Sequence, residues 1–145
     1  MADLICSRTS DPARRLGPRF LVVGRHDDLR RLLVSALRRL GCIAHGSRDL
    51  DEVALRQAHW PDAAVVVDAG AEDEGETRAT TDRLLRLRES GRGGKVLVLV
   101  ARPAPAADLP PELSAAADGV LGKPFELGEF ERSILELLYP EARRA

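Results

Sequence analysis

Two charged side chains of this sequence lie where a protein could use them chemically, because each comes at the end of a short apolar segment. Asp68 follows the apolar residues 63–67, and Lys123 follows residues 119–121 and precedes Pro124. A carboxylate can act as a nucleophile or bind a cation, and a lysine can neutralise a bound anion or that carboxylate. Whether the two share a site depends on the elements that carry them.

Short apolar segments alternate with amphipathic segments along most of the chain. The continuous apolar segments predict strands that are covered on both faces, at residues 19–24, 42–45, 63–67, 95–101 and 119–121. The amphipathic segments predict helices at residues 29–40, 50–59, 77–90, 110–117 and 126–138. This alternation favours an α/β fold with a doubly wound five-stranded parallel sheet in a three-layer α/β/α sandwich.

The ends of the predicted helices carry recognisable signals. We expect Asp27 or Asp28 to cap the first helix, Gly41 to end it, and Ser47 or Asp49 to cap the second. The arginines of the first helix are expected on its solvent-exposed face, and they are Arg30, Arg31, Arg38 and Arg39. In such a fold ligands bind beyond the carboxyl ends of the strands, here residues 24–28, 67–70, 100–102 and 121–124.

Composition limits the classes of protein that fit. The chain has 145 residues, 44% of them hydrophobic, which suits one domain at residues 19–138 with a flexible leader (1–18) and a C-terminal tail (139–145). A net charge of −1 argues against binding to nucleic acid or to a membrane surface. No apolar run approaches the about 20 residues of a membrane span, and the two cysteines have no disulfide or metal-site spacing, so we expect a cytoplasmic protein.

Three segments resemble the receiver domains of response regulators, the CheY-like family of bacterial two-component signal transduction and phosphorelays. They are F-L-V-V-G-R-H-D-D-L-R-R-L-L at residues 20–33, W-P-D-A-A-V-V-V-D at 60–68, and A-D-G-V-L-G-K-P-F at 117–125. The last is the most specific of the three. The resemblance implies the flavodoxin-like receiver fold. It also implies a site in which two acids and a strand-end aspartate hold magnesium, and that aspartate accepts a phosphoryl group.

Most positions of that site depart from the family pattern. The paired acids correspond to Gly24 and Arg25, neither of which can bind a hard cation. The Thr or Ser that closes over the phosphoryl group corresponds to Val100, and the aromatic switch residue to Val120. Lys123 is retained, and the resemblance implies a cis peptide bond to Pro124.

The phosphoacceptor position is open between two residues. Counting forward from the Pro-Asp pair and back from Gly75 places it at Val67, one residue before Asp68. A shift of one residue turns a strand side chain to the opposite face, although a bulge at the strand end could bring Asp68 back. Asp68 is therefore the phosphoacceptor candidate, and we expect it within salt-bridge reach of Lys123 or Arg25.

The departures together favour a pseudo-receiver: no enzyme, no cofactor and no metal, acting through a protein partner at residues 109–138, as a monomer or weak homodimer. Lys123 would then be a structural partner of Asp68 or bind an anionic partner, and Arg25 would replace the magnesium charge or lie in solvent. The alternative is a phosphoacceptor on Asp68 that uses Asp27, Asp28 or Glu74 as displaced metal ligands. A nucleotide-binding domain is disfavoured because no Gly-rich phosphate loop follows the first strand.

Overall fold

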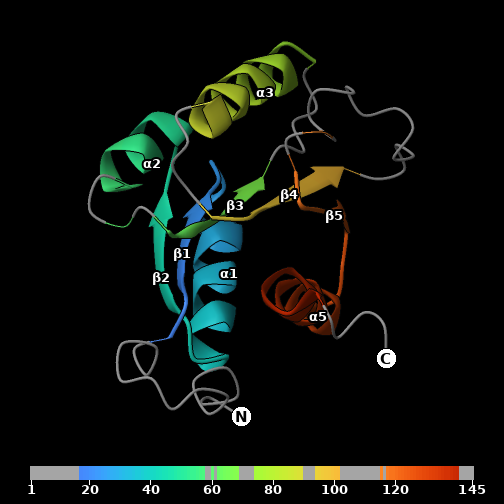
Figure 1. The fold of residues 1–145 in the computed structure, drawn as a ribbon. Coiled ribbons are helices and arrows are strands. Elements are labelled where there is room, and N and C mark those ends of the chain that lie inside the picture. Colours follow the sequence, from blue (N-terminus) through green and yellow to red (C-terminus); the bar gives the residue numbers. More distant parts are fainter. Residues whose placement is uncertain are drawn as a thin grey trace.

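All five strands of the sheet are parallel, in the order β2-β1-β3-β4-β5 (Figure 1). A computed structural model describes residues 17–57, 60, 62–68, 74–89, 94–101, 115 and 117–140. The strands are β1 (Arg19–Val23), β2 (Ile43–Ser47), β3 (Ala64–Asp68), β4 (Val96–Ala101) and β5 (Gly119–Lys123). This arrangement confirms the doubly wound five-stranded parallel sheet.

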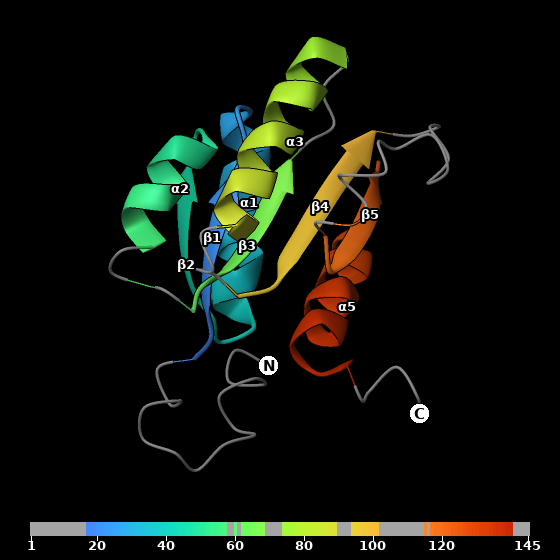
Figure 2. The same cartoon turned by 45° about the horizontal axis from the view of Figure 1, so that its top comes forward.

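Helices cover both faces of the sheet. They are α1 (Asp27–Arg39), α2 (Leu50–Gln57), α3 (Glu74–Glu89) and α5 (Leu127–Leu138). In Figures 1 and 2, α1 and α5 lie on one face, and α2 and α3 lie on the other. The helix expected at residues 110–117 lies almost entirely outside the described residues, as do the leader up to residue 16, the acidic loop at 69–73 and residues 141–145.

Alternate residues of the central strands supply two buried apolar layers, because successive side chains of a strand point to opposite faces. The layer under α1 and α5 includes Phe20, Val22, Ala64, Val66, Leu97 and Leu99, packed against Leu33, Leu37, Phe130 and Ile134. The layer under α2 and α3 includes Leu21, Val23, Val65, Val67, Val98 and Val100, packed against Val53, Leu84 and Leu87. Because both faces of these strands are buried, the strands must be apolar at every position, as the sequence predicts. Within the described residues, no helix has the length and apolar character to span a membrane.

The start of α1 differs from the prediction. His26 is the N-cap residue and makes no side-chain capping bond, whereas Asp27 and Asp28 lie in the first turn. The carboxylate of Asp27 instead accepts a hydrogen bond from Arg30. The other two signals are confirmed: Gly41 follows the helix with φ 96°, and Asp49 Oδ1 accepts a hydrogen bond from the backbone N–H of Glu52 at 2.8 Å.

Candidate functional site

The carboxyl ends of β1 and β3 bring Gly24 and Asp68 side by side. The strands pair in regular register up to Val23 and Val67, and the residues after this pair are Gly24 and Asp68. A Cβ atom on Gly24 would lie 3.4 Å from Asp68 Cβ and 3.9 Å from its Oδ2. Gly24 is buried. The position that corresponds to a family acid is therefore directly beside the Asp68 carboxylate, and it carries no side chain.

The regular register shows which of the two residues, Val67 or Asp68, has its side chain at the strand-end site. Val67 is 1% exposed and packs in the layer under α2 and α3, so its assignment to the site was wrong. Asp68 is the last residue of β3 and pairs with Leu99 without a bulge. Both residue counts failed because they assumed the family's spacings in the connections before and after β3, and connection lengths vary more than the strands they join.

Lys123 ends β5 and reaches Asp68. Its Nζ donates a hydrogen bond to Asp68 Oδ1 at 2.6 Å, and the side chains are 21% and 7% exposed, respectively. The ion pair between Asp68 and Lys123 is thus confirmed. The Lys123–Pro124 peptide bond is cis, as the resemblance implies.

Arg30 is a site residue that the sequence analysis missed. Its Nη1 donates a hydrogen bond of 2.6 Å to the carbonyl oxygen of Gly24, and its Nη2 donates one of 2.5 Å to Asp27 Oδ1. Its side chain is only 15% exposed, so the expectation of a solvent-facing residue was wrong. The signal was available in the spacing, because Asp27 and Arg30 are three residues apart and i,i+3 pairs meet on a helix.

The same cluster controls the titration of Asp27. The hydrogen bond and positive charge of Arg30 lower the pKa of Asp27 below 3.8, and Arg48, whose Nη2 lies 3.5 Å from Oδ2, lowers it further. A carboxylate that already has these partners is a poor ligand for a hard cation, since binding a metal would mean giving up ion pairs.

The remaining predicted site residues lie as follows. Arg25 is exposed just beyond the end of β1. Val100 is 7% exposed and belongs to the apolar layer under α2 and α3, whereas Val120 on β5 is 41% exposed. Pro124 is exposed after Lys123. The structure therefore joins Gly24, Asp68 and Lys123 in one site, buries Val100 in the core and leaves Val120 at the surface.

These residues do not fit the magnesium ion of the receiver family. Gly24 offers no ligand, Arg25 offers a positive charge, and the Asp68 carboxylate already binds an ammonium group. In the part of the chain that the structure describes, no group of three or more His, Cys, Asp or Glu residues is placed to hold a metal ion. Asp28 is exposed, and the side chain of Glu74 lies outside the described residues. The described residues therefore do not supply the set of oxygen ligands that a divalent cation needs.

Structural comparison identifies the fold. A response regulator from Thermotoga maritima superposes with a TM-score of 0.70 at 21% identity, covering 83% of this chain and 97% of that one. The chain has the response-regulator receiver fold. A receiver protein from Pseudoalteromonas atlantica gives a TM-score of 0.68 at 19% identity over 86% of this chain and 99% of its own. One from Burkholderia phymatum gives 0.64 at 23% identity over 83% and 94%.

Comparison of the sequence with known families and proteins does not identify the chain further. The chain matches no protein-family model, and no curated protein matches it. A fold can be shared without a detectable sequence match, because it depends on the apolar layers more than on particular residues of a site.

Proposed function

We propose that this chain is a receiver domain of a signal-transduction pathway that acts by protein contact, without being phosphorylated and without enzymatic activity. The observation that carries the proposal is the position of Gly24 beside Asp68, where a Cβ atom would lie 3.4 Å from Asp68 Cβ. The position that the resemblance assigns to a magnesium ligand therefore has no side chain, and Asp68 is paired with Lys123 inside the chain.

Phosphoryl transfer depends on positioning and on neutralising the charge of the transferred group. In the receiver family, magnesium and its acidic ligands do most of this. Here Lys123 places a positive charge against Asp68, and the Gly24 carbonyl oxygen is bonded to Arg30. Stabilising an incoming anion as the family does would require a bound cation, and the described residues contain no group of three or more His, Cys, Asp or Glu placed to hold one.

The proposed contact surface is residues 109–138, of which the structure describes residue 115 and residues 117–138. Its described part includes β5 and α5, and Val120 is 41% exposed on β5 where the resemblance implies an aromatic residue. The proposed surface therefore rests on the resemblance, and Val120 supplies one apolar side chain to it. We propose a protein partner of the same signalling pathway, in the cytoplasm.

One observation supports the alternative, a phosphoacceptor on Asp68. The carboxylate lies at the carboxyl edge of the sheet and is bonded to the retained Lys123, as the resemblance implies for a working site. The two proposals differ in the need for magnesium.

Magnesium titration followed by backbone amide shifts separates them. We expect no saturable shift at Arg25, Asp68 or Lys123 up to millimolar magnesium. A saturable shift at these amides, absent from an Asp68→Asn variant, would contradict the proposal and favour the phosphoacceptor.

A further inference from the structure

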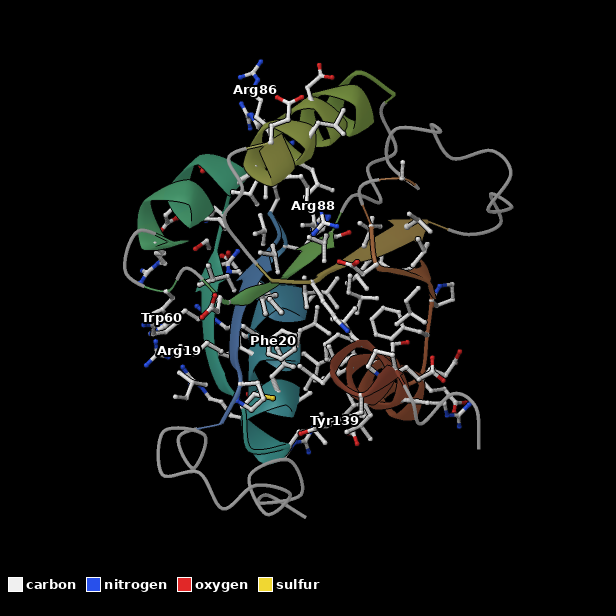
Figure 3. The ribbon with its side chains drawn as sticks, in the orientation of Figure 1. Arg19, Phe20, Trp60, Arg86, Arg88 and Tyr139 are labelled. Atoms are coloured by element: carbon white, nitrogen blue, oxygen red, sulfur yellow. The ribbon has the colours of Figure 1, made fainter. Side chains whose placement is uncertain are left out.

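Three side chains gather near the amino ends of β1 and β2, on the face of the sheet that α2 and α3 cover. Arg19 starts β1 and shares this face with Leu21, because alternate residues of a strand point to the same side. Its Cζ lies over the Trp60 ring, 5.4 Å from the centroid, and Figure 3 shows the two side chains together. The His45 ring on β2 lies 4.6 Å from the Trp60 ring, and Trp60 also packs against the apolar layer below it. With Arg56 in the last turn of α2, these residues form what we call the β1–β2 patch.

The charges that act on this patch are mainly positive. Burial lowers the pKa of His45, and the next causes are the positive charges of Arg56 and of Arg38, which reaches β2 from α1. Two described acids are near the patch in the chain. Glu52 lies 3.7 Å from Arg56, with the two side chains 44% and 43% exposed, and Asp62 is exposed. An ion pair as exposed as that of Glu52 and Arg56 contributes little, so a stronger acidic partner can replace Glu52.

The patch is rich in hydrogen-bond donors that no described residue uses. Among the described residues, the Arg19 guanidinium has no partner besides the Trp60 ring. Stacking places the face of the guanidinium against the ring, so the N–H groups along its edge stay available. The indole N–H of Trp60 and the ring nitrogens of His45 likewise have no hydrogen-bond partner in the described part of the chain. A ligand that fits this patch must therefore supply acceptors.

The backbone edge of β2 is closed to a further strand. β2 is an edge strand of the sheet, and the backbone of Ile43 and of Ser47 bonds toward β1, so Ala44 between them faces outward. Arg38 Nη2 donates a hydrogen bond of 2.9 Å to the carbonyl oxygen of Ala44. A side chain over the edge hinders the addition of a strand. A partner at this corner of the molecule therefore contacts the side chains of the patch rather than extending the sheet.

We propose that the β1–β2 patch binds an acidic segment of a partner protein. A carboxylate is an acceptor only, and the guanidinium fork of Arg19 binds a carboxylate through two parallel hydrogen bonds. Because Arg19 is already held by stacking, less conformational entropy is lost when it binds. The net charge of −1 favours a protein partner over nucleic acid. This patch lies near the amino edge of the sheet and goes beyond the contact surface at 109–138, so either surface can fail its test without the other.

Trp60 is the only tryptophan of the chain, so its fluorescence reports directly on the patch. Titrating the full chain at low salt with hexaglutamate, a short acidic peptide, should give a saturable change in the Trp60 emission. Hexaglutamine, which has no carboxylates, should give none. Arg19→Gln should weaken the binding of hexaglutamate by about fivefold or more, because it removes both the charge and the fork. Arg86→Gln is the matched control: it removes an exposed arginine of α3 that lies away from Trp60 (Figure 3), and it should leave binding unchanged.

Three results would overturn the proposal. The first is the absence of a saturable change with hexaglutamate, or an equal affinity of Arg19→Gln and the unchanged chain. The second is an equal loss in Arg86→Gln, which would show attraction by net charge alone. The third is tighter binding of a single-stranded oligothymidine of the same net charge, whose bases can stack on tryptophan, since the patch would then be a nucleic-acid site. Denaturation midpoints confirm that each variant is folded.

Discussion

Lys123 and Asp68 form an ion pair of 2.6 Å although they lie 55 positions apart in the chain. They end β5 and β3, which are not neighbours, because β4 lies between them. The Asp68 side chain is 7% exposed and that of Lys123 21%. A charge so far removed from water needs its partner, so the pair connects the two halves of the carboxyl edge as well as neutralising the site.

Replacing Asp68 by Asn should destabilise the fold. Removing one partner of a buried pair costs about 3–5 kcal/mol, and exposed pairs contribute less than about 1 kcal/mol. For this partly buried pair we expect a loss on the order of 2 kcal/mol in the free energy of unfolding, measured by urea denaturation. Asp62→Asn, at an exposed position, is the control and should change little.

A double-mutant cycle shows whether that loss belongs to the pair. Lys123→Met removes the unpaired ammonium group that Asp68→Asn leaves behind. The double variant should therefore be less destabilised than the sum of the two single variants. Strict additivity, or an unchanged midpoint in Asp68→Asn, would show that the ion pair does not hold the strand ends together.

Restoring acids should create a metal site. A Cβ atom at Gly24 would meet Asp68 only at ordinary contact distance, and the φ of Gly24 is not in the left-handed region, so an aspartate fits there. We expect the variant Gly24→Asp with Arg25→Asp to bind magnesium measurably by calorimetry, while the unchanged chain does not. Gly128→Asp adds a carboxylate in open space on α5 and should not produce binding.

Arg30 should control the protonation of Asp27. Since the hydrogen bond and charge of Arg30 are the largest causes of the lowered pKa of Asp27, Arg30→Met should raise that pKa toward 3.8. Arg48→Met should raise it less, because Arg48 is 71% exposed and lies 3.5 Å away. The pKa of Asp27 in both variants can be measured from its carboxyl carbon shift during a pH titration. A rise in Arg48→Met that equals or exceeds the rise in Arg30→Met would contradict the prediction.

His45 should make the fold sensitive to acid. Its ring lies 4.6 Å from that of Trp60, over which Arg19 is stacked (Figure 3). Burial, followed by the positive charges of Arg56 and Arg38, lowers the pKa of His45 below 6.5. The unfolded chain then binds the proton more tightly, so stability is lost as the pH falls from about 6.5 through the folded-state pKa.

Urea midpoints at about pH 7.5 and about pH 5 measure this loss, which carboxylates also affect. His45→Gln should reduce the difference between the two midpoints. His26→Gln, at the exposed start of α1, should leave the difference as it is in the unchanged chain. If the urea midpoint falls by the same amount between the two pH values in the unchanged chain and in His45→Gln, the prediction is wrong.

The part of the site that follows from topology could be predicted from the sequence. Once the strands are known to be parallel, Gly24, Asp68 and Lys123 must meet at one edge, because each ends or follows a strand. The sequence predicts the last strand only up to residue 121, because the next residue, Gly122, disfavours strand structure. The strand in fact continues to Lys123. This extension depends on pairing with β4, where Ala101 lies opposite Lys123.

The part that depends on competition between side chains could not be predicted. Asp27 could cap α1 or bind Arg30, and these choices differ by roughly 1 kcal/mol or less, which sequence alone does not resolve. The structure selects Arg30 because that side chain also reaches the Gly24 carbonyl oxygen. The counts that gave Val67 failed for a different reason, since the register of β3 is set by its pairing with β1 and not by the spacing to the Pro-Asp pair or to Gly75.

Incubation with acetyl phosphate and magnesium, followed by intact mass, tests most directly whether Asp68 is chemically silent. Lys123 neutralises its carboxylate, and the residues beside it cannot hold the metal. We therefore predict an unchanged mass, the same as that of an Asp68→Asn variant treated in parallel. A phosphoryl adduct that forms on the unchanged chain and is absent from Asp68→Asn would contradict the account and make Asp68 a working phosphoacceptor.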